Sequence, residues 1–288
     1  MQIVQAAEMP VKTRQSSGRV GSYGVRDVMN GEPGSAGNFS LKIYDQNGSF
    51  GSPRHHHSFD QFRYQIEGDA DFGRTGKMRP GTLGYFPEGA YYGPQSGPPH
   101  VVAVLQFGGP SGLGYLSSGE HRGAAEELRK HGVFEGGIYR RNPDVEGKRN
   151  QDSYEAIWEH ASGRPLVYPK PQYDDPILMS APRYPWQPVD GHLGVFERSL
   201  GTFTSCRIRA AEYRLEPGAE FSAAGRGIYL FLTGTGQVGE EKFRDLTTLY
   251  LGTGEDAVIS ATAETEIVLM GLPDIALMAK PAAGEDGS

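Results

Sequence analysis

Glycine and proline divide this chain into short apolar runs, and this division limits the possible fold more than any other feature of the sequence. The 288 residues include 41 glycines and 20 prolines, which are spread along the chain rather than collected in one linker. Short alternating runs bounded by such residues predict β-strands. In the first half, four runs fit this pattern and can form one barrel: residues 39–44, 61–67, 82–86 and 101–107.

The same texture returns in the second half, from about residue 195 to residue 277. In each half a strand pair is followed by glycine, a further strand, a turn and a very apolar closing strand. The closing strands are residues 101–105 and 267–273. We interpret the repeated layout as a divergent internal duplication. The sequence therefore predicts a mainly β chain with two barrels.

The segment between the two β halves has a different composition. Residues 120–130 and 152–161 predict helices, whereas the proline- and tyrosine-rich residues 168–194 predict irregular chain on a surface. The expected division of the chain is a first barrel over 1–115, a helical and proline-rich connector over 116–190, a second barrel over 191–280 and a disordered tail over 281–288.

Charge and cysteine content exclude several classes of function. The formal net charge is −7 and the basic residues are scattered, which argues against a nucleic-acid or anionic-membrane partner and favours a small molecule. Cys206 is the only cysteine, so neither an intrachain disulfide nor a multi-cysteine zinc site can form. The N-terminal residues lack a signal-peptide pattern, and no apolar stretch has the length of a membrane span. We expect a cytoplasmic protein.

Two histidines and a glutamine form the pattern that carries chemistry. His55 and His57 are two residues apart, so in extended chain both imidazoles leave the same face, while His56 points to the other. Gln61 lies four residues beyond His57 and can return a neutral oxygen toward the same point. Arg63 lies two residues further and points the same way if the strand is regular, where a substrate carboxylate or an internal ion pair would balance its charge.

Across about residues 48–108 the spacing resembles that of the cupin superfamily, whose members are small jelly-roll barrels, and the duplication resembles a bicupin. Gly81, Pro87 and Gly89 are in register with the second motif of that family, and Tyr92 occupies the position of its third histidine. In the first motif, Gln61 replaces the family's glutamate. In the second half no histidine stands at the ligand positions, which implies a degenerate barrel without a metal.

The resemblance implies a divalent transition metal held by His55, His57 and Gln61, with iron favoured and manganese, nickel or zinc as alternatives. It also implies a small oxygenated or acidic organic substrate. Tyr92 can supply a phenolate ligand or act as general acid or base, and Arg63 can orient the substrate. Tyr85 and Gln106 are further candidates for substrate binding.

These observations leave several functions open. We favour a metal-dependent, dioxygenase-type oxidoreductase. The alternatives are a metal-assisted isomerase, lyase or cyclase, a ligand-binding bicupin without turnover, and metal-free acid–base catalysis by Tyr92 and a histidine. A homodimer is expected by analogy with cupins alone.

Overall fold

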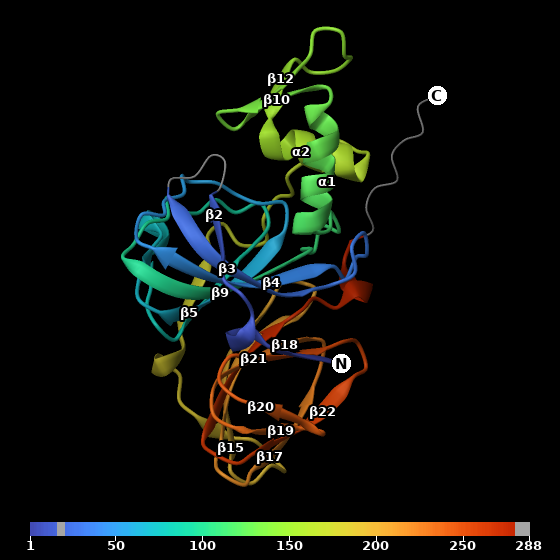
Figure 1. Cartoon of the computed structure of the whole chain (residues 1–288). Coiled ribbons are helices and arrows are strands. Elements are labelled where there is room, and N and C mark those ends of the chain that lie inside the picture. Colours follow the sequence, from blue (N-terminus) through green and yellow to red (C-terminus); the bar gives the residue numbers. More distant parts are fainter. Residues whose placement is uncertain (16–20, 280–288) are drawn as a thin grey trace.

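The computed structural model describes residues 1–15 and 21–279, and the tail that was expected to be disordered, residues 281–288, lies outside these ranges. In Figure 1 the first β half lies above the second, and the connector lies against the first half on the side away from the second. The first half contains a seven-stranded antiparallel sheet with the order β13-β8-β5-β9-β4-β3-β2. Its strands are β2 (Lys12–Gln15), β3 (Ser22–Asn30), β4 (Phe39–Asn47), β5 (Asp60–Glu67), β8 (Thr82–Phe86), β9 (Pro99–Phe107) and β13 (Ile177–Ser180), with the hairpin β6 (Ala70–Asp71) and β7 (Lys77–Met78) beside them.

The second half repeats this layout with a seven-stranded and a four-stranded sheet. The larger sheet has the order β1-β21-β18-β23-β16-β15-β14 and the smaller has the order β17-β22-β19-β20. The strands of the larger sheet are β1 (Gln2–Gln5), β14 (Gln187–Pro188), β15 (Val195–Phe203), β16 (Ile208–Leu215), β18 (Gly227–Thr233), β21 (Thr247–Leu251) and β23 (Thr265–Gly271). Those of the smaller sheet are β17 (Glu220–Ala224), β19 (Gly236–Val238), β20 (Glu241–Phe243) and β22 (Asp256–Ala261).

The connector folds into a small unit of its own, with α1 (Ser118–Arg129), α2 (Ser153–Ser162) and a sheet of β10 (Gly132–Glu135), β11 (Ile138–Arg141) and β12 (Asn150–Asp152). Both helices begin at a side-chain cap. Ser117 and Glu120 form a capping box at α1, and Asp152 accepts two backbone N–H groups at α2. The two predicted helices are therefore present, with ends within two residues of those expected. Short 3₁₀ turns occur at Ala6–Glu8, Gly73–Thr75, Ala181–Arg183 and Ile275–Leu277.

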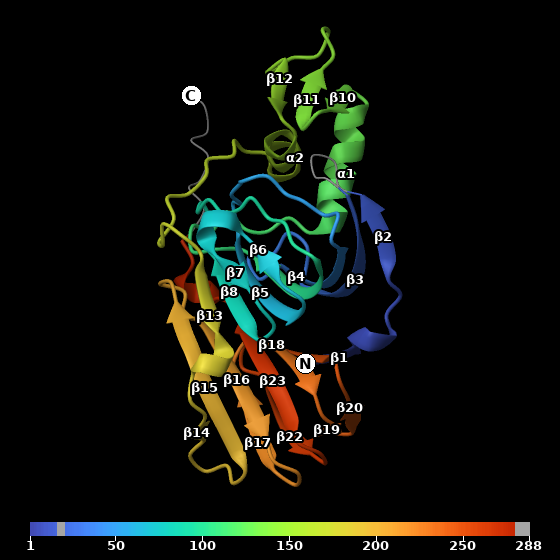
Figure 2. The same ribbon diagram turned by 90° about the vertical axis from the view of Figure 1, so that its left-hand side faces the viewer.

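Three strands, β1, β13 and β14, cross the expected boundaries between the parts of the chain, and β14 of the expected connector pairs with β15 of the second half. β1 pairs with β21, so the first residues complete the sheet of the second half, as Figure 2 shows. β13, from the proline-rich stretch, pairs with β8 of the first half. The prediction assigned residues 1–115 and 116–190 to separate units because sequence periodicity identifies a strand but not its partner.

The large sheets of the two halves pack on each other through one apolar core. Alternate residues of each strand enter it, such as Phe62 of β5, Leu105 of β9, Leu230 of β18 and Met270 of β23. The interior of the second barrel is a separate apolar cluster that includes Tyr229, Phe231 and Leu249. The first barrel differs, because the face of β5 turned away from the shared core carries Gln61, Arg63 and Gln65, all buried.

Candidate active site

The histidine segment lies in extended chain just before β5. A pair of backbone hydrogen bonds joins His55 to Tyr92, with N···O distances of 3.1 and 3.0 Å. This bridge places the imidazole of His55 beside the Tyr92 ring, with centroids 4.5 Å apart, and the centroid of His57 lies 4.9 Å from that of His55. The structure thus brings together His55, His57 and Tyr92, which are up to 37 residues apart in the sequence.

His56 points to the other side of the segment, where it is held between two tyrosine rings. Its centroid lies 4.1 Å from that of Tyr91 and 3.9 Å from that of Tyr168 in the connector, and both pairs are stacked. Burial lowers the pKa of His56 below its ordinary value. This contact attaches the connector to the outside of the first barrel and leaves His56 out of the site.

Arg63 is the centre of a buried hydrogen-bond network. Its guanidinium donates from Nη2 to the Tyr92 hydroxyl at 3.0 Å, from Nε to Gln61 Oε1 at 3.3 Å and from Nη1 to Gln95 Oε1 at 2.8 Å. The same group lies 4.8 Å from the ring centroid of Phe86 and 5.2 Å from that of Phe72. Aromatic faces attract a cation at this distance, so the rings and the three oxygens fix the position of the charge.

Because arginine has donors and no acceptor, it sets the direction of its neighbours' hydrogen bonds. Gln61 must turn its oxygen to Arg63, so its amide nitrogen donates to the Tyr92 hydroxyl at 2.8 Å. The Tyr92 oxygen then accepts two N–H groups, and its own proton points to His57 Nε2 at 2.7 Å. The Tyr92 hydroxyl therefore donates a hydrogen bond to His57 Nε2, which is an acceptor nitrogen in this arrangement.

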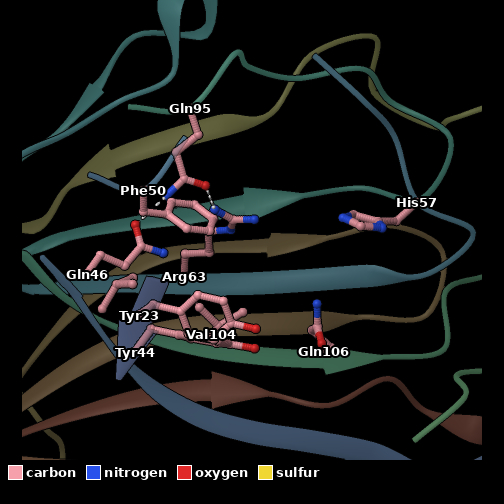
Figure 3. A pocket seen from close by; sticks show the side chains of 10 residues that line it. Tyr23, Tyr44, Gln46, Phe50, His57, Arg63, Gln95, Val104 and Gln106 are labelled. Carbon is pink, nitrogen blue, oxygen red and sulfur yellow. Dashed lines mark hydrogen bonds between the residues drawn. The ribbon is translucent and has the colours of Figure 1, made fainter. Parts of the chain in front are cut away.

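A cavity of about 30 Å³ lies inside the first barrel next to this network (Figure 3). His57 and Arg63 line it, and Tyr92, which does not line it, is hydrogen-bonded to both. The other lining residues are Tyr23, Tyr44, Gln46, Phe50, Gln95, Val102, Val104 and Gln106. Gln106, predicted for substrate binding, is thus at the cavity wall together with Arg63.

Tyr85 is not at the cavity, although it was predicted to bind substrate. Neighbouring residues of a strand face opposite sides, and in β8 it is Phe86 that contacts Arg63 and Tyr92. Tyr85 faces the shared core, where its hydroxyl donates to Asp60 at 2.8 Å. We therefore leave Tyr85 out of the proposed site.

The predicted metal ligands do not form a set that fits a divalent cation. Such a cation needs three or four lone pairs aimed at one centre. His55 alone has the orientation of a ligand, because its Nδ1 lies 2.7 Å from the Pro53 carbonyl oxygen and its Nε2 is left as the lone-pair nitrogen. The Gln61 oxygen accepts a hydrogen bond from Arg63, and His57 Nε2 accepts one from the Tyr92 hydroxyl. The fixed charge of Arg63 also opposes a second cation.

No carboxylate compensates for this arrangement. Among residues 1–15 and 21–279, no group of three or more His, Cys, Asp or Glu side chains is placed to hold a metal ion. Asp60 and Glu88, the buried carboxyl groups nearest in sequence to Gln61 and Tyr92, are not among the residues that line the cavity. Burial raises the pKa of both, that of Asp60 to about 8. The donor set at Arg63 therefore serves hydrogen bonding rather than metal coordination.

Several residues of this network were not found from the sequence. Gln46 and Gln95 are both buried and are joined by a hydrogen bond of 3.1 Å from Gln95 Nε2 to Gln46 Oε1. Gln95 follows Tyr92 by three residues, and Gln46 lies in β4, far from the histidine motif. A glutamine in a strand carries no spacing signal of its own. Burial of its amide opposite an arginine is visible only in the folded chain.

The comparisons with known proteins show the fold. No protein-family model matches the sequence, and no curated protein matches it. Among solved structures, a "putative dioxygenase" from Nostoc punctiforme PCC 73102 is similar with a TM-score of 0.63 and 11% identity, covering 95% of this chain and 82% of that chain. Oxalate decarboxylase from Bacillus subtilis, another study of which concerns its Mn(II) centers, has a TM-score of 0.51 at 12% identity, covering 94% of this chain and 76% of that one. At such identities the likeness confirms the predicted fold class, a mainly β chain of two cupin-type jelly-roll barrels, and no more.

Proposed function

We propose that this chain is an enzyme that catalyses proton transfer on a small oxygenated or acidic molecule in the cavity of its first barrel. The observation that carries the proposal is the position of the Tyr92 hydroxyl. It is 2% exposed, accepts N–H groups from Arg63 and Gln61, and donates to His57, which lines the cavity. A structural tyrosine needs one partner, whereas three converge on this oxygen.

The network stabilises the state that a proton transfer creates. When the proton of Tyr92 moves to His57 Nε2, the phenolate that remains lies 3.0 Å from the Arg63 guanidinium and 2.8 Å from the Gln61 amide nitrogen. Charge-assisted hydrogen bonds of this kind are stronger than neutral ones. With Tyr92 in its phenolate form, His57 can take a proton from the substrate and pass the proton on Nε2 to the Tyr92 oxygen. The opposite transfers, from Tyr92 to Nε2 and from the imidazolium to the substrate anion, return a proton to the substrate and regenerate the phenolate.

Isomerisation and elimination are the reaction classes that such a relay serves. Both pass through an enolate or a similar anion, need a proton removed or returned at a stated atom, and require no oxidant. Arg63, at the cavity wall, supplies positive charge for an acidic group or for the enolate oxygen. Gln61, Arg63 and Tyr92 are buried, which makes the electrostatic effects between them larger than they are in solution.

The iron-dependent dioxygenase that the sequence resemblance favoured stays a prediction. It is supported by the fold likeness to a "putative dioxygenase". It would require the Gln61 oxygen and the His57 lone pair to leave the partners they have here. Elemental analysis of protein made without an affinity tag, with and without chelator treatment, separates the two proposals directly.

The test of the proposal is the variant Tyr92→Phe. It removes one hydroxyl and keeps the ring that packs on His55, Phe72 and Phe86. Incubation of small 2-oxo and 3-hydroxy acids in D₂O, followed by NMR, measures exchange of their acidic C–H protons. We expect exchange by the wild-type protein in the presence of chelator, and a loss of about 10²–10⁴-fold in Tyr92→Phe.

The neighbouring tyrosine gives a matched control. Tyr91 is 44% exposed and stacks on His56 outside the cavity, so Tyr91→Phe should leave the exchange rate unchanged. Stoichiometric metal that disappears in His55→Ala and His57→Ala, together with activity abolished by chelation, would contradict the proposal. Equal rates in Tyr92→Phe and the wild type would also contradict it.

A further inference from the structure

The cavity wall offers hydrogen-bond donors where a ligand would lie. Of the ten residues that line the cavity, Arg63 carries a permanent positive charge, and none is an aspartate or glutamate. The remaining polar groups are amides, phenols and one imidazole. The charge of the wall is therefore positive, and the direction of its amides decides what else it offers.

Arg63 fixes the direction of two amides in series. Its Nη1 donates to Gln95 Oε1 at 2.8 Å, so Gln95 must use its nitrogen for the next bond. That nitrogen donates to Gln46 Oε1 at 3.1 Å. The oxygen of Gln46 is thus occupied, and its amide nitrogen is the group that can donate a hydrogen bond to a ligand. Both glutamines are at least 95% buried, with exposed fractions of 4% and 5%, so water does not reorient them freely.

Gln106 faces the cavity with the same polarity from the other side. Its Oε1 accepts from the Tyr115 hydroxyl at 3.0 Å. In Figure 3 the amide nitrogen of Gln106 lies on the side of Arg63 and His57, and its oxygen lies on the opposite side. Two amide N–H groups and a guanidinium thus border one space, and this is the donor pattern that a carboxylate accepts.

We infer that this cavity is a carboxylate subsite and that Gln46, held by Gln95, is a specificity-determining residue in it. The inference rests on the proposed function and narrows its substrate to an acid whose carboxylate enters the barrel. The volume of about 30 Å³ has room for about two water molecules. That is the scale of one carboxylate group rather than of a ring, so the rest of the substrate lies toward His57.

Binding of acetate and its neutral isostere acetamide tests the inference. Saturation-transfer NMR with chelator present should show acetate binding to the wild-type protein and acetamide binding at least about tenfold more weakly, because the amide offers one acceptor and no charge. Inorganic sulfate, which is larger and tetrahedral, should not compete with acetate. Equal binding of acetate and acetamide would overturn the inference.

The variant Gln46→Glu tests the named residue. Glutamate has the same size and can still accept from Gln95, but it replaces the N–H donor by a carboxylate oxygen. Acetate affinity should fall about tenfold to a hundredfold. Gln237→Glu, at an exposed position of β19, adds the same charge away from the cavity and should leave affinity unchanged. Should Gln46→Glu fail to fold, Gln46→Leu removes the donor without a charge, and undiminished acetate binding in that variant would equally sink the inference.

The outcome is separable from that of the proposed function. Tyr92 does not line the cavity, so Tyr92→Phe should keep acetate binding while it loses proton exchange. If acetate binds but neither the wild-type protein nor any variant exchanges substrate protons, the proposed function is refuted and the carboxylate subsite stands. Exchange on neutral substrates without acetate binding would refute the subsite alone.

Discussion

At the scale of single residues, one pure donor organises the site. Arg63 turns Gln61 and Gln95 so that each presents its oxygen to the guanidinium and its nitrogen onward. A lysine at this position would keep the charge but would lack the planar fork that bonds three oxygens at once. The chemistry of Tyr92 and the polarity of the cavity therefore have the same origin.

Asp60 gives a residue-scale prediction about pH. Burial, and then the charge of Glu88, raise its pKa to about 8 from an ordinary value of 3.8, although the Glu88 N–H and the Tyr85 hydroxyl both donate to it. The folded chain thus holds a proton that the unfolded chain releases, so the free energy of unfolding should fall as pH rises between those values. One proton corresponds to a slope of about 1.4 kcal/mol per pH unit.

The variant Asp60→Asn isolates this effect. Asparagine keeps an acceptor for the Glu88 N–H and does not titrate. Urea unfolding at about pH 5, 6 and 7 should show a steeper fall in stability for the wild type than for Asp60→Asn. Parallel pH dependences of the two proteins would show that Asp60 is ionised in the folded chain.

At the scale of elements, β1 is a strand supplied from outside the half that it completes. It pairs along β21, with Ile3 opposite Leu249, and Gln5 accepts a hydrogen bond of 2.7 Å from Thr247. Removal of residues 1–5 would leave the edge of β21 unpaired. From four lost backbone pairs and the burial of Ile3 we expect a loss of roughly 2–4 kcal/mol.

Thermal unfolding and hydrogen exchange measure this prediction. The melting temperature should fall, and the amides of β21 should lose protection before those of β9, which is in the other sheet. Gln2→Ala, which changes an exposed side chain and keeps the strand, should leave both readings unchanged. Unaltered protection of β21 after the truncation would mean that β1 contributes nothing to the second half.

At the scale of the whole molecule, the two barrels share one apolar core and divide their roles. The second barrel fills its own interior with apolar side chains, and the first keeps a polar cavity. No helix in the described ranges has the length and apolarity needed to cross a membrane. The second barrel therefore supports the first through the apolar core between their two large sheets.

This arrangement predicts that the halves unfold together. Leu230 of β18 is fully buried in the shared core, and Leu230→Ala should cost about 2–5 kcal/mol. Hydrogen exchange should show that β9 of the first half and β21 of the second lose stability by similar amounts. A first half that keeps its protection while the second exchanges would show that the halves fold independently.

The sequence by itself determined the two-barrel fold and the helices of the connector, because glycine and proline spacing and strand alternation are local properties. That Tyr92 lies beside His55 and His57 was predicted from the resemblance to cupin spacing rather than from a local pattern. The pairing of β1 with β21, the exclusion of Tyr85 and the entry of Gln46 and Gln95 were decided only by the tertiary structure. The physical reason is that a hydrogen bond's direction depends on which side chain lies opposite. The Gln61 amide can present either its oxygen or its nitrogen to a neighbour, and the buried guanidinium of Arg63, which only donates, selects the orientation with the oxygen toward Arg63.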